Sequence, residues 1–190
     1  MTDMFVVPRG AAGERGAALM TTTGAPMARR AVDALDPGSA ETVLEIGFGP
    51  GVAMTLLAAA VPDGLVVGVD PSDLMHRWAG RRNAEAVRAG RVSLLPGSAG
   101  ALPLSSGSVD AALAIDNLHF WPDPAAGVAE LRRVVRRTGR VVIAFTPPSG
   151  GPPPGWRALF LDGGFPGVEV RRVQEGMILR ARAAVPESDL

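Results

Sequence analysis

Short apolar runs alternate with segments of helical spacing along most of this chain. The predicted strands lie at residues 43–46, 65–69, 91–95, 109–115 and 140–145. The predicted helices lie at residues 26–35, 52–60, 73–88, 124–137 and 156–162. Because strands and helices alternate, the pattern predicts an α/β fold with a mostly parallel, doubly wound sheet that is covered by helices on both faces.

The two ends of the chain depart from this alternation. Residues 168–173 and 177–181 flank Glu175-Gly176 and predict an antiparallel hairpin that closes one edge of the sheet. Residues 147–155 are mostly proline and glycine and are expected to be irregular. Residues 1–25 predict a flexible N-terminal arm that is part helix and part loop, which leaves residues 26–190 as one domain.

The first predicted strand ends in Gly47, Gly49 and Gly51, three glycines at alternate positions. Glycine permits a positive φ and lets a ligand approach the main chain closely, so this loop is a candidate binding site. Glu45 lies inside the apolar strand, where a carboxylate is costly to bury unless it accepts hydrogen bonds from amides or from a ligand. The spacing is Gly-x-Gly-x-Gly, not the Gly-x-Gly-x-x-Gly of dinucleotide-binding folds.

Asp70 ends the second predicted strand. An acid at the carboxyl end of a parallel strand faces the crevice in which open α/β sheets bind ligands. The alternative interpretation is that Asp70 only caps a turn or the following helix. Ser72 and Asp73 are the other candidates for the cap of that helix.

Composition excludes several classes of function. The chain has 190 residues and equal numbers of basic and acidic residues, 19 of each, so no net field draws it to nucleic acid or to an anionic membrane. It has no cysteine, which excludes disulfides and thiolate metal sites. No signal pattern or membrane-spanning run is present, and we expect a cytoplasmic protein with no metal and no nucleic-acid or membrane partner.

Several motifs in order resemble the class I S-adenosylmethionine (SAM)-dependent methyltransferases of small-molecule type, methyltransferase type 11 or ubiquinone-menaquinone methyltransferase-like. Val-Leu-Glu-Ile-Gly-Phe-Gly-Pro-Gly at residues 43–51 resembles motif I, and Val-Val-Gly-Val-Asp-Pro-Ser at residues 66–72 resembles the strand with the ribose-binding acid. Residues 131–143 resemble the helix, turn and strand that follow the catalytic segment. The resemblance implies SAM as cofactor and a seven-stranded sheet of order 3-2-1-4-5-7-6 with an antiparallel last strand.

The resemblance also implies roles for single residues. The cofactor-binding residues would be Glu45, Gly47, Gly49, Gly51, Asp70, Pro71, Ser98, Ala99 and Asp116. Asp70 would accept both ribose hydroxyls, and residues 97–104 would be the adenine segment. Ser98 departs from the family, which usually has an acid there to accept a hydrogen bond from the adenine amine. Serine accepts such a bond more weakly.

His119 follows the fourth predicted strand and is the candidate catalytic residue. As a general base it could take a proton from the methyl acceptor near neutral pH, and the alternative is a structural histidine. His76 is expected to be structural. Candidates to wall the acceptor pocket are Phe120, Trp121, Phe145 and Trp156.

The sequence therefore predicts a methyltransferase that moves a methyl group from SAM to a small, partly apolar metabolite by in-line displacement. The alternatives are a non-catalytic SAM-binding module or partner subunit, and, less favoured, a nicotinamide-dependent reductase. The acceptor site has no long cap after the fifth strand, so its roof would come from the N-terminal arm, through Leu19 and Met20, or from a second subunit in a homodimer.

Overall fold

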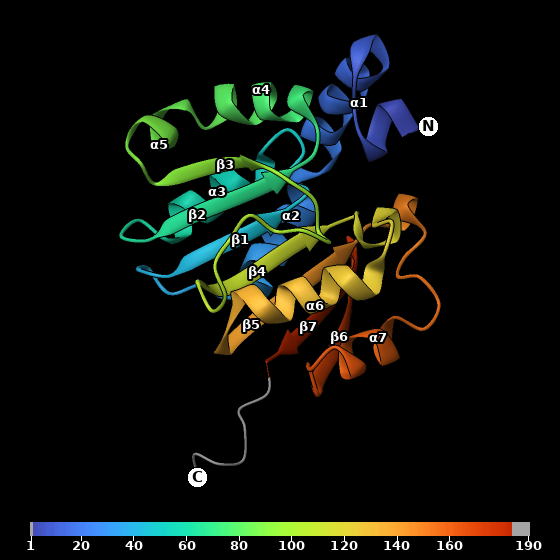
Figure 1. Cartoon of the computed structure of the whole chain (residues 1–190). Coiled ribbons are helices and arrows are strands. Elements are labelled where there is room, and N and C mark those ends of the chain that lie inside the picture. The colour runs from blue at the N-terminus through green and yellow to red at the C-terminus, as the bar shows by residue number, and fades with distance from the viewer. Residues whose placement is uncertain (1, 184–190) are drawn as a thin grey trace.

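The predicted strand order is confirmed in the computed structural model, which describes residues 2–183 (Figure 1). One seven-stranded sheet has the order β3-β2-β1-β4-β5-β7-β6. The strands are β1 (Thr42–Ile46), β2 (Leu65–Asp70), β3 (Val92–Pro96), β4 (Val109–Ile115), β5 (Val135–Phe145), β6 (Gly167–Val173) and β7 (Gly176–Arg182). The first five are parallel to one another, whereas β7 runs antiparallel to both β5 and β6.

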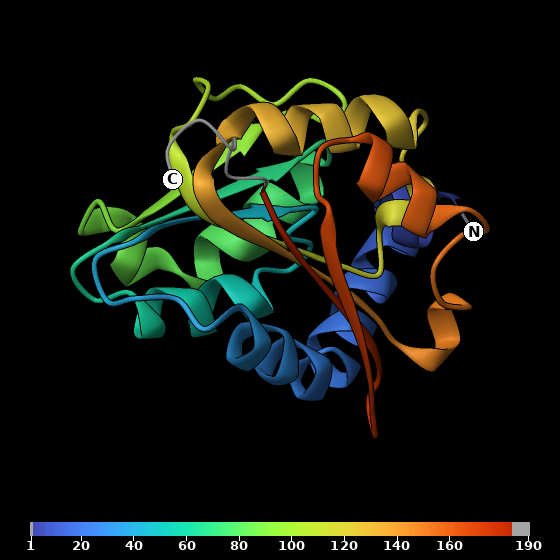
Figure 2. The same ribbon diagram turned by 90° about the horizontal axis from the view of Figure 1, so that it is seen from below.

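Helices cover both faces of this sheet. They are α1 (Gly10–Thr23), α2 (Ala25–Leu35), α3 (Val52–Ala60), α4 (Asp73–Arg82), α5 (Ala84–Arg88), α6 (Pro124–Val134) and α7 (Trp156–Asp162). Figure 2 shows α2 and α6 on opposite sides of the sheet. The doubly wound α/β class predicted from the alternation is therefore confirmed.

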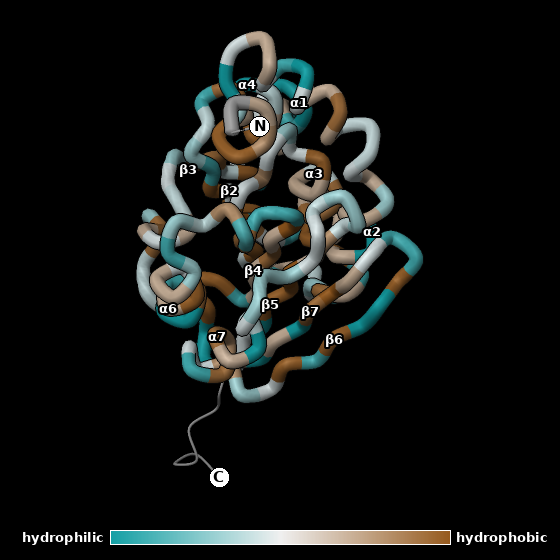
Figure 3. Tube along the Cα trace, turned by 90° about the vertical axis from the view of Figure 1, so that its right-hand side faces the viewer, coloured by the Kyte–Doolittle hydropathy of each residue, from teal (hydrophilic) through white to brown (hydrophobic). Residues whose placement is uncertain are grey.

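Two hydrophobic cores result, one on each face. Successive residues of a strand point to opposite faces, so Val43 of β1 packs under α2 and α3 while Leu44 and Ile46 pack under α6. The central strands are apolar on both faces, as parallel strands under two helical layers require. In Figure 3, which looks toward the ends of the strands, hydrophobic stretches lie in β4, β5 and β7 between the helices.

Two of the predicted helices differ from the structure. The helix predicted over residues 73–88 breaks at Asn83, because the Asn83 Nδ2 donates to the Ala79 carbonyl at 3.0 Å and to the Gly51 carbonyl at 3.2 Å. The helix predicted to residue 137 ends at Val134. Val135 instead starts β5 beside Val109, is buried, and is followed by Arg136, which pairs with Asp110 of β4.

The N-terminal segment lies against the same end of the sheet as the loops that follow β1 and β2 (Figure 1). A short π-helix, Thr2–Val6, precedes α1, and α1 packs on α4. The residues that follow β5 were expected to be irregular throughout, but Pro147–Ser149 forms one turn of 3-10 helix.

Candidate functional site

The glycine loop after β1 has the conformation that its sequence predicted. Gly47, Gly49 and Gly51 have φ values of 66°, 51° and 79°, in the left-handed region. Between them, the Phe48 ring is 3% exposed and packs over Gly68 of β2, where a Cβ would lie 2.6 Å from the ring. The buried Phe48 ring anchors the loop to β2. The main chain of the glycines therefore lies at the carboxyl ends of the strands.

Close contacts fix two of these glycines. A Cβ on Gly47 would lie 2.4 Å from Nδ2 of Asn117, and one on Gly51 would lie 2.7 Å from Nδ2 of Asn83. The Gly47 amide also donates to the Val69 carbonyl at 2.7 Å, which ties the loop to the end of β2. Side chains larger than hydrogen are therefore excluded at both positions.

Asp70 ends β2 and faces this loop. Its Oδ2 accepts the Gly49 amide at 3.0 Å and its Oδ1 accepts the Ser72 amide at 2.8 Å, while the residue is only 5% exposed. Burial raises the pKa of Asp70, and the two amides and the nearby His76 oppose that rise. His76, expected to be structural, contacts the Asp70 main-chain oxygen through Nε2 at 2.9 Å. Each carboxylate oxygen has a second lone pair for another donor.

Glu45 lies on the adjacent strand and is 3% exposed. Among the described residues no hydrogen-bond partner reaches its Oε2. Burial, and secondly the charge of Asp70, raise the pKa of Glu45 well above its ordinary value. Two carboxyl groups thus share one buried region beside the glycine loop, and a cation or a hydrogen-bond donor placed there would relieve both.

The predicted adenine segment lies beside these acids. Ser98 is exposed and Ala99 is 6% exposed, and a tight turn returns the chain to Ala101, whose amide donates to the Ser98 carbonyl at 3.1 Å. Pro71 is exposed at the start of the β2–α4 connection. It lines a pocket of about 300 Å³ that lies between this connection and the N-terminal segment.

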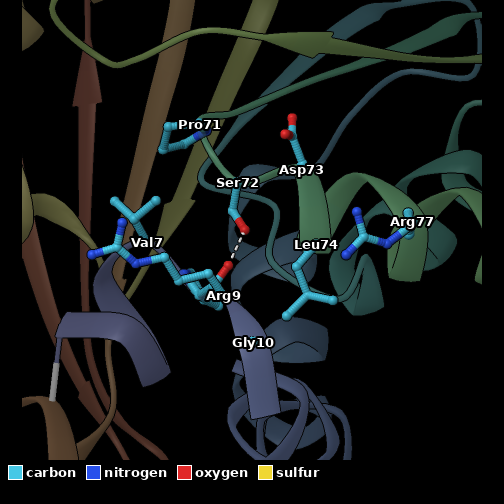
Figure 4. Close-up of a pocket in the computed structure, with 9 residues that line it drawn as sticks. Val7, Arg9, Gly10, Pro71, Ser72, Asp73, Leu74 and Arg77 are labelled. Atoms are coloured by element: carbon cyan, nitrogen blue, oxygen red, sulfur yellow. Dashed lines mark hydrogen bonds between the residues drawn. The ribbon is translucent and has the colours of Figure 1, made fainter. Parts of the chain in front are cut away.

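The N-terminal segment closes over the end of β2. Figure 4 shows Val7, Arg9 and Gly10 facing Pro71 and Ser72 across the pocket. The Ser72 hydroxyl donates to the Pro8 carbonyl at 2.5 Å and also accepts the Met75 amide at 3.3 Å as the cap of α4. Of the two candidates, Ser72 is therefore the residue that caps α4. Because its amide also donates to Asp70, Ser72 links the N-terminal segment to the Asp70 carboxylate.

Helix α1 makes further contacts with α4 and with the glycine loop. Glu14 accepts the Trp78 Nε1 at 2.7 Å, and Arg82 bridges the Thr21 hydroxyl at 3.3 Å and the Pro50 carbonyl at 3.0 Å. Met20 is partly buried, with its sulfur 3.8 Å from where a Cβ on Gly49 would lie. Leu19, the other expected apolar contact, is 47% exposed.

Asp116 lies on the other side of β1, after β4, and has a positive φ of 54°. Its carboxylate accepts the Thr146 amide at 2.6 Å and the Thr146 hydroxyl at 2.8 Å. The Asp116 carboxylate thus contacts Thr146, directly after β5, whereas the Asp70 carboxylate contacts the glycine loop.

Sequence reasoning missed two asparagines beside the loop. Asn117 donates to the Ile46 carbonyl at 2.6 Å and accepts the Trp121 Nε1 at 3.1 Å, which places its side chain over Gly47. Asn83 holds the Gly51 carbonyl and accepts the Thr55 hydroxyl at 2.8 Å. The signal for Asn117 was its place directly after a buried strand. For Asn83, it was a lone amide in a helix otherwise rich in alanine and arginine.

His119 lies in a 3-10 turn, Leu118–Phe120, after β4. Its ring centroid is 4.0 Å from that of Phe120 and 6.3 Å from that of Phe145, and no partner among the described residues reaches its buried Nδ1. Burial lowers the pKa of His119, and Asp116 opposes that shift. The imidazole is therefore mainly neutral near neutral pH.

The four aromatic candidates separate by burial. Phe145 is 1% exposed and Trp121 is 8% exposed, and both belong to the core under α6. Phe120 is 37% exposed and Trp156 is half-buried, with the Arg157 guanidinium 5.4 Å from its ring centroid. Only Phe120 and Trp156 are thus accessible to a ligand.

The strand order with an antiparallel β7, together with the positive-φ glycine loop that faces Asp70, is that of the class I SAM-dependent methyltransferase fold. Residues 44–143 match the family described as "Methyltransferase domain", and the chain belongs to that family. Membership of this family implies SAM as the methyl donor. The nicotinamide-dependent alternative is thereby set aside.

Relatives and solved structures agree with the family. The chain is 39% identical over 156 residues to an uncharacterized 37.1 kDa protein in a transposon of Streptomyces fradiae, a match covering 80% of this chain and 41% of that protein. It is 36% identical over 124 residues to demethylmenaquinone methyltransferase of Thermus thermophilus, covering 65% and 56% of the two chains. The chain therefore spans about half the length of these relatives.

Among solved structures, a putative SAM-dependent methyltransferase from Methanococcus maripaludis superposes with a TM-score of 0.76 at 19% identity. That likeness covers 93% of this chain and 94% of the other, and it supports the fold. Within residues 2–183, every helix is too short or too polar to cross a membrane. The same part of the chain contains no group of three metal-binding side chains.

Proposed function

We propose that this chain binds SAM at the carboxyl ends of β1, β2 and β4 and transfers its methyl group to a small, partly apolar acceptor. The observation that carries the proposal is the pair of buried carboxyl groups of Asp70 and Glu45 beside the glycine loop. SAM presents two ribose hydroxyls and carries positive charge on its sulfonium and its amino group. The site offers acceptors and negative charge to match.

Different residues of the site would bind different parts of the cofactor. Asp70 would accept the ribose hydroxyls with the lone pairs that Gly49 and Ser72 leave open, and Glu45 would face the charged amino-acid end. Gly47, Gly49 and Gly51 would lie beneath the methionine and the ribose. Pro71, Ser98 and Ala99 would contact the adenine, and Asp116 would act by holding β4 to β5 and so fixing Asn117 over Gly47.

The cofactor supplies a methyl group that its sulfonium already activates. The chain therefore has to hold the acceptor in line and to accept its proton, and positioning alone can contribute about 7–11 kcal/mol. His119 is the proposed proton acceptor, because its pKa is lowered and its Nδ1 has no partner among the described residues.

A His119→Gln variant tests this role. We expect kcat to fall by about 100-fold while the affinity for S-adenosylhomocysteine stays within about twofold. In the wild type the acid limb of the kcat profile should lie below pH 6.5, because the pKa of His119 is lowered. A variant with wild-type kcat would assign His119 a structural role.

The accessible aromatic rings support a partly apolar acceptor. Phe120 and Trp156 lie on the connections that follow β4 and β5. The Thermus relative is named for demethylmenaquinone, which favours a small-molecule acceptor. The contacts of α1 with α4 and the loop make the N-terminal arm the proposed roof, and a homodimer remains the alternative.

Calorimetric titration with S-adenosylhomocysteine tests the binding step directly. Saturable binding, together with methylation of at least one member of a panel of small acceptors, is the expected outcome. Binding without turnover would favour the alternative, a non-catalytic SAM-binding module or partner subunit, for which the exposed Ser98 in place of an acid is the motivating observation. No binding at millimolar ligand would refute both.

Limited proteolysis tests the roof. If the arm closes over the cofactor, S-adenosylhomocysteine should slow cleavage before Pro26 several-fold relative to cleavage within residues 147–155. Equal rates with and without the ligand would remove the arm from the site and leave the homodimer.

A further inference from the structure

The connection between β3 and β4, residues 97–108, is fully described and contains no helix, although it crosses the face of the sheet that α6 covers. Ala99 and Leu102 from this connection are buried in the same core as Val69 and Leu131. A segment without helical hydrogen bonds depends on outside partners to hold its main chain. For residues 102–104 of this connection, the partners come from α6.

The side chains of Glu130 and Arg133, here called the clamp, supply these hydrogen-bond partners. Arg133 donates from Nη1 to the Leu104 carbonyl at 2.6 Å and from Nη2 to the Leu102 carbonyl at 3.0 Å. Glu130 accepts the Leu102 amide on Oε2 at 2.8 Å. Arg133 also pairs with Glu130 through two hydrogen bonds of 2.6 and 2.7 Å. Three main-chain groups are thus held by one bidentate pair, a geometry that a lysine cannot reproduce.

The clamped residues Leu102 and Leu104 belong to the proposed adenine segment and lie close to Ser98 and Ala99. Leu102 directly follows the turn in which the Ala101 amide donates to the Ser98 carbonyl at 3.1 Å. A Cβ on Gly97 would lie 3.0 Å from a methyl of Val69 and 3.1 Å from Pro103, so the two arms of the turn are closely packed against the end of β2. We therefore expect a displacement of Leu102 to shift Ser98 and Ala99 as well.

We propose that Arg133 and Glu130 are positioning residues that set the selectivity of the site for the adenine base. The inference rests on the proposed function. The clamp fixes the positions of Ser98 and of the Ala99 amide at the edge of the base. The amino group of adenine can then donate a hydrogen bond to Ser98. A loosened turn still binds a nucleoside, but it distinguishes less between bases.

A second clamp of the same chemistry provides a matched control. Arg140 pairs with Glu41 through two hydrogen bonds of 3.0 and 2.7 Å and donates to the carbonyls of Leu35 and Asp36, both at 2.6 Å. It joins β5 to the α2–β1 connection at the opposite end of the strands from the glycine loop. Arg133→Lys and Arg140→Lys thus remove equivalent bonds from two different segments.

The experiment compares two ligands, S-adenosylhomocysteine and S-inosylhomocysteine, in which an oxo group replaces the amine of the base. Calorimetry gives the ratio of their dissociation constants for the wild type, Arg133→Lys, Glu130→Gln and Arg140→Lys. We expect the wild type to prefer the adenine ligand, and the ratio to fall about five- to tenfold in Arg133→Lys and Glu130→Gln. The ratio should stay within about twofold in Arg140→Lys, even though its melting temperature falls.

An unchanged ratio in both Arg133→Lys and Glu130→Gln would overturn this inference while leaving the proposed function intact. An equal loss of selectivity in Arg140→Lys would also overturn it, because a general loss of stability would then be the cause. A wild type that binds neither ligand would overturn the proposed function and this inference with it. Thermal denaturation of each variant identifies any that fails to fold, and either of the two clamp variants suffices for the test.

Discussion

The amino ends of the parallel strands carry paired charges, whereas the carboxyl ends carry buried acids and main chain in the left-handed region. At the amino ends, Asp110 accepts the Thr42 amide at 2.8 Å and pairs with Arg136, and Arg140 pairs with Glu41. At the carboxyl ends, Glu45 has an oxygen with no partner among the described residues, and His119 has such a nitrogen.

This difference separates stability from binding. The ion pairs of Asp110 and Arg140 also bond main-chain groups of neighbouring segments, and such bonds stabilise the fold. Unpaired buried groups and positive φ values cost stability, and they persist where the surrounding structure holds them in place. We therefore expect substitutions at the amino ends to change stability and substitutions at the carboxyl ends to change ligand binding.

The largest effect should come from Asp70→Asn. The variant loses the charge that would strengthen two hydrogen bonds to the ribose, each worth about 1.5–3 kcal/mol, so calorimetry should show S-adenosylhomocysteine binding at least about 100-fold weaker. Asp110→Asn is the matched control at the amino end. It should lower the free energy of unfolding by about 1 kcal/mol and keep the affinity within about twofold. Similar affinity losses in the two variants would contradict the separation.

Gly51→Ala should strongly destabilise the loop. The new methyl would lie 2.7 Å from Asn83 and 2.8 Å from Ala79, at a φ of 79°, so urea unfolding should show a loss of about 3 kcal/mol. Gly107→Ala adds the same methyl at a φ of 60° with nothing within 4 Å, and it should cost only about 1 kcal/mol. Equal losses would show that conformational strain alone, without crowding, fixes Gly51.

Arg140→Met should lower the free energy of unfolding by about 2 kcal/mol. The Arg140 side chain is 11% exposed, and its loss removes the donor to the Leu35 and Asp36 carbonyls and leaves the Glu41 carboxylate with the Gly38 amide as donor. Affinity for S-adenosylhomocysteine, measured by calorimetry well below the melting temperature, should not change. A loss of affinity with this variant would show that the two ends are coupled.

The smallest effect concerns pH. Because the pKa of Glu45 is raised in the folded protein, the carboxyl group binds its proton more tightly there than in the unfolded chain. The contribution of Glu45 to the stability of the ligand-free protein should therefore be complete below the ordinary pKa of a glutamate, and it should be lost as pH rises through the raised pKa of the folded protein. Glu45→Gln, which resembles the protonated acid, should show a smaller fall in melting temperature over that range. Parallel curves for the two proteins would place the titrating group elsewhere.

Local sequence carried enough information for the strands and the glycine loop, whereas the strand order followed from the resemblance to the family. Residues 43–46 and 109–115 are apolar on both faces of a strand, and only a central position under two helical layers buries both. The glycine spacing and Asp70 also predicted the loop and its facing acid. Whether Asp70 binds ribose stays a prediction.

What the sequence missed depends on contacts between distant residues. The break at Asn83 requires the Gly51 carbonyl, 32 positions away, and the early start of β5 requires Asp110 as a partner for Arg136. The clamp of Glu130 and Arg133 resembles a solvent-exposed i,i+3 pair until the main chain of residues 102–104 is placed against it. Helical spacing describes one element at a time and cannot include such partners.

A crystal structure of the chain with S-adenosylhomocysteine tests the central claim most directly. The account predicts both ribose hydroxyls within hydrogen-bond distance of the Asp70 carboxylate, with the adenine between Pro71 and Ala99. A nucleoside bound elsewhere, with Asp70 still contacting only the Gly49 and Ser72 amides, would contradict it.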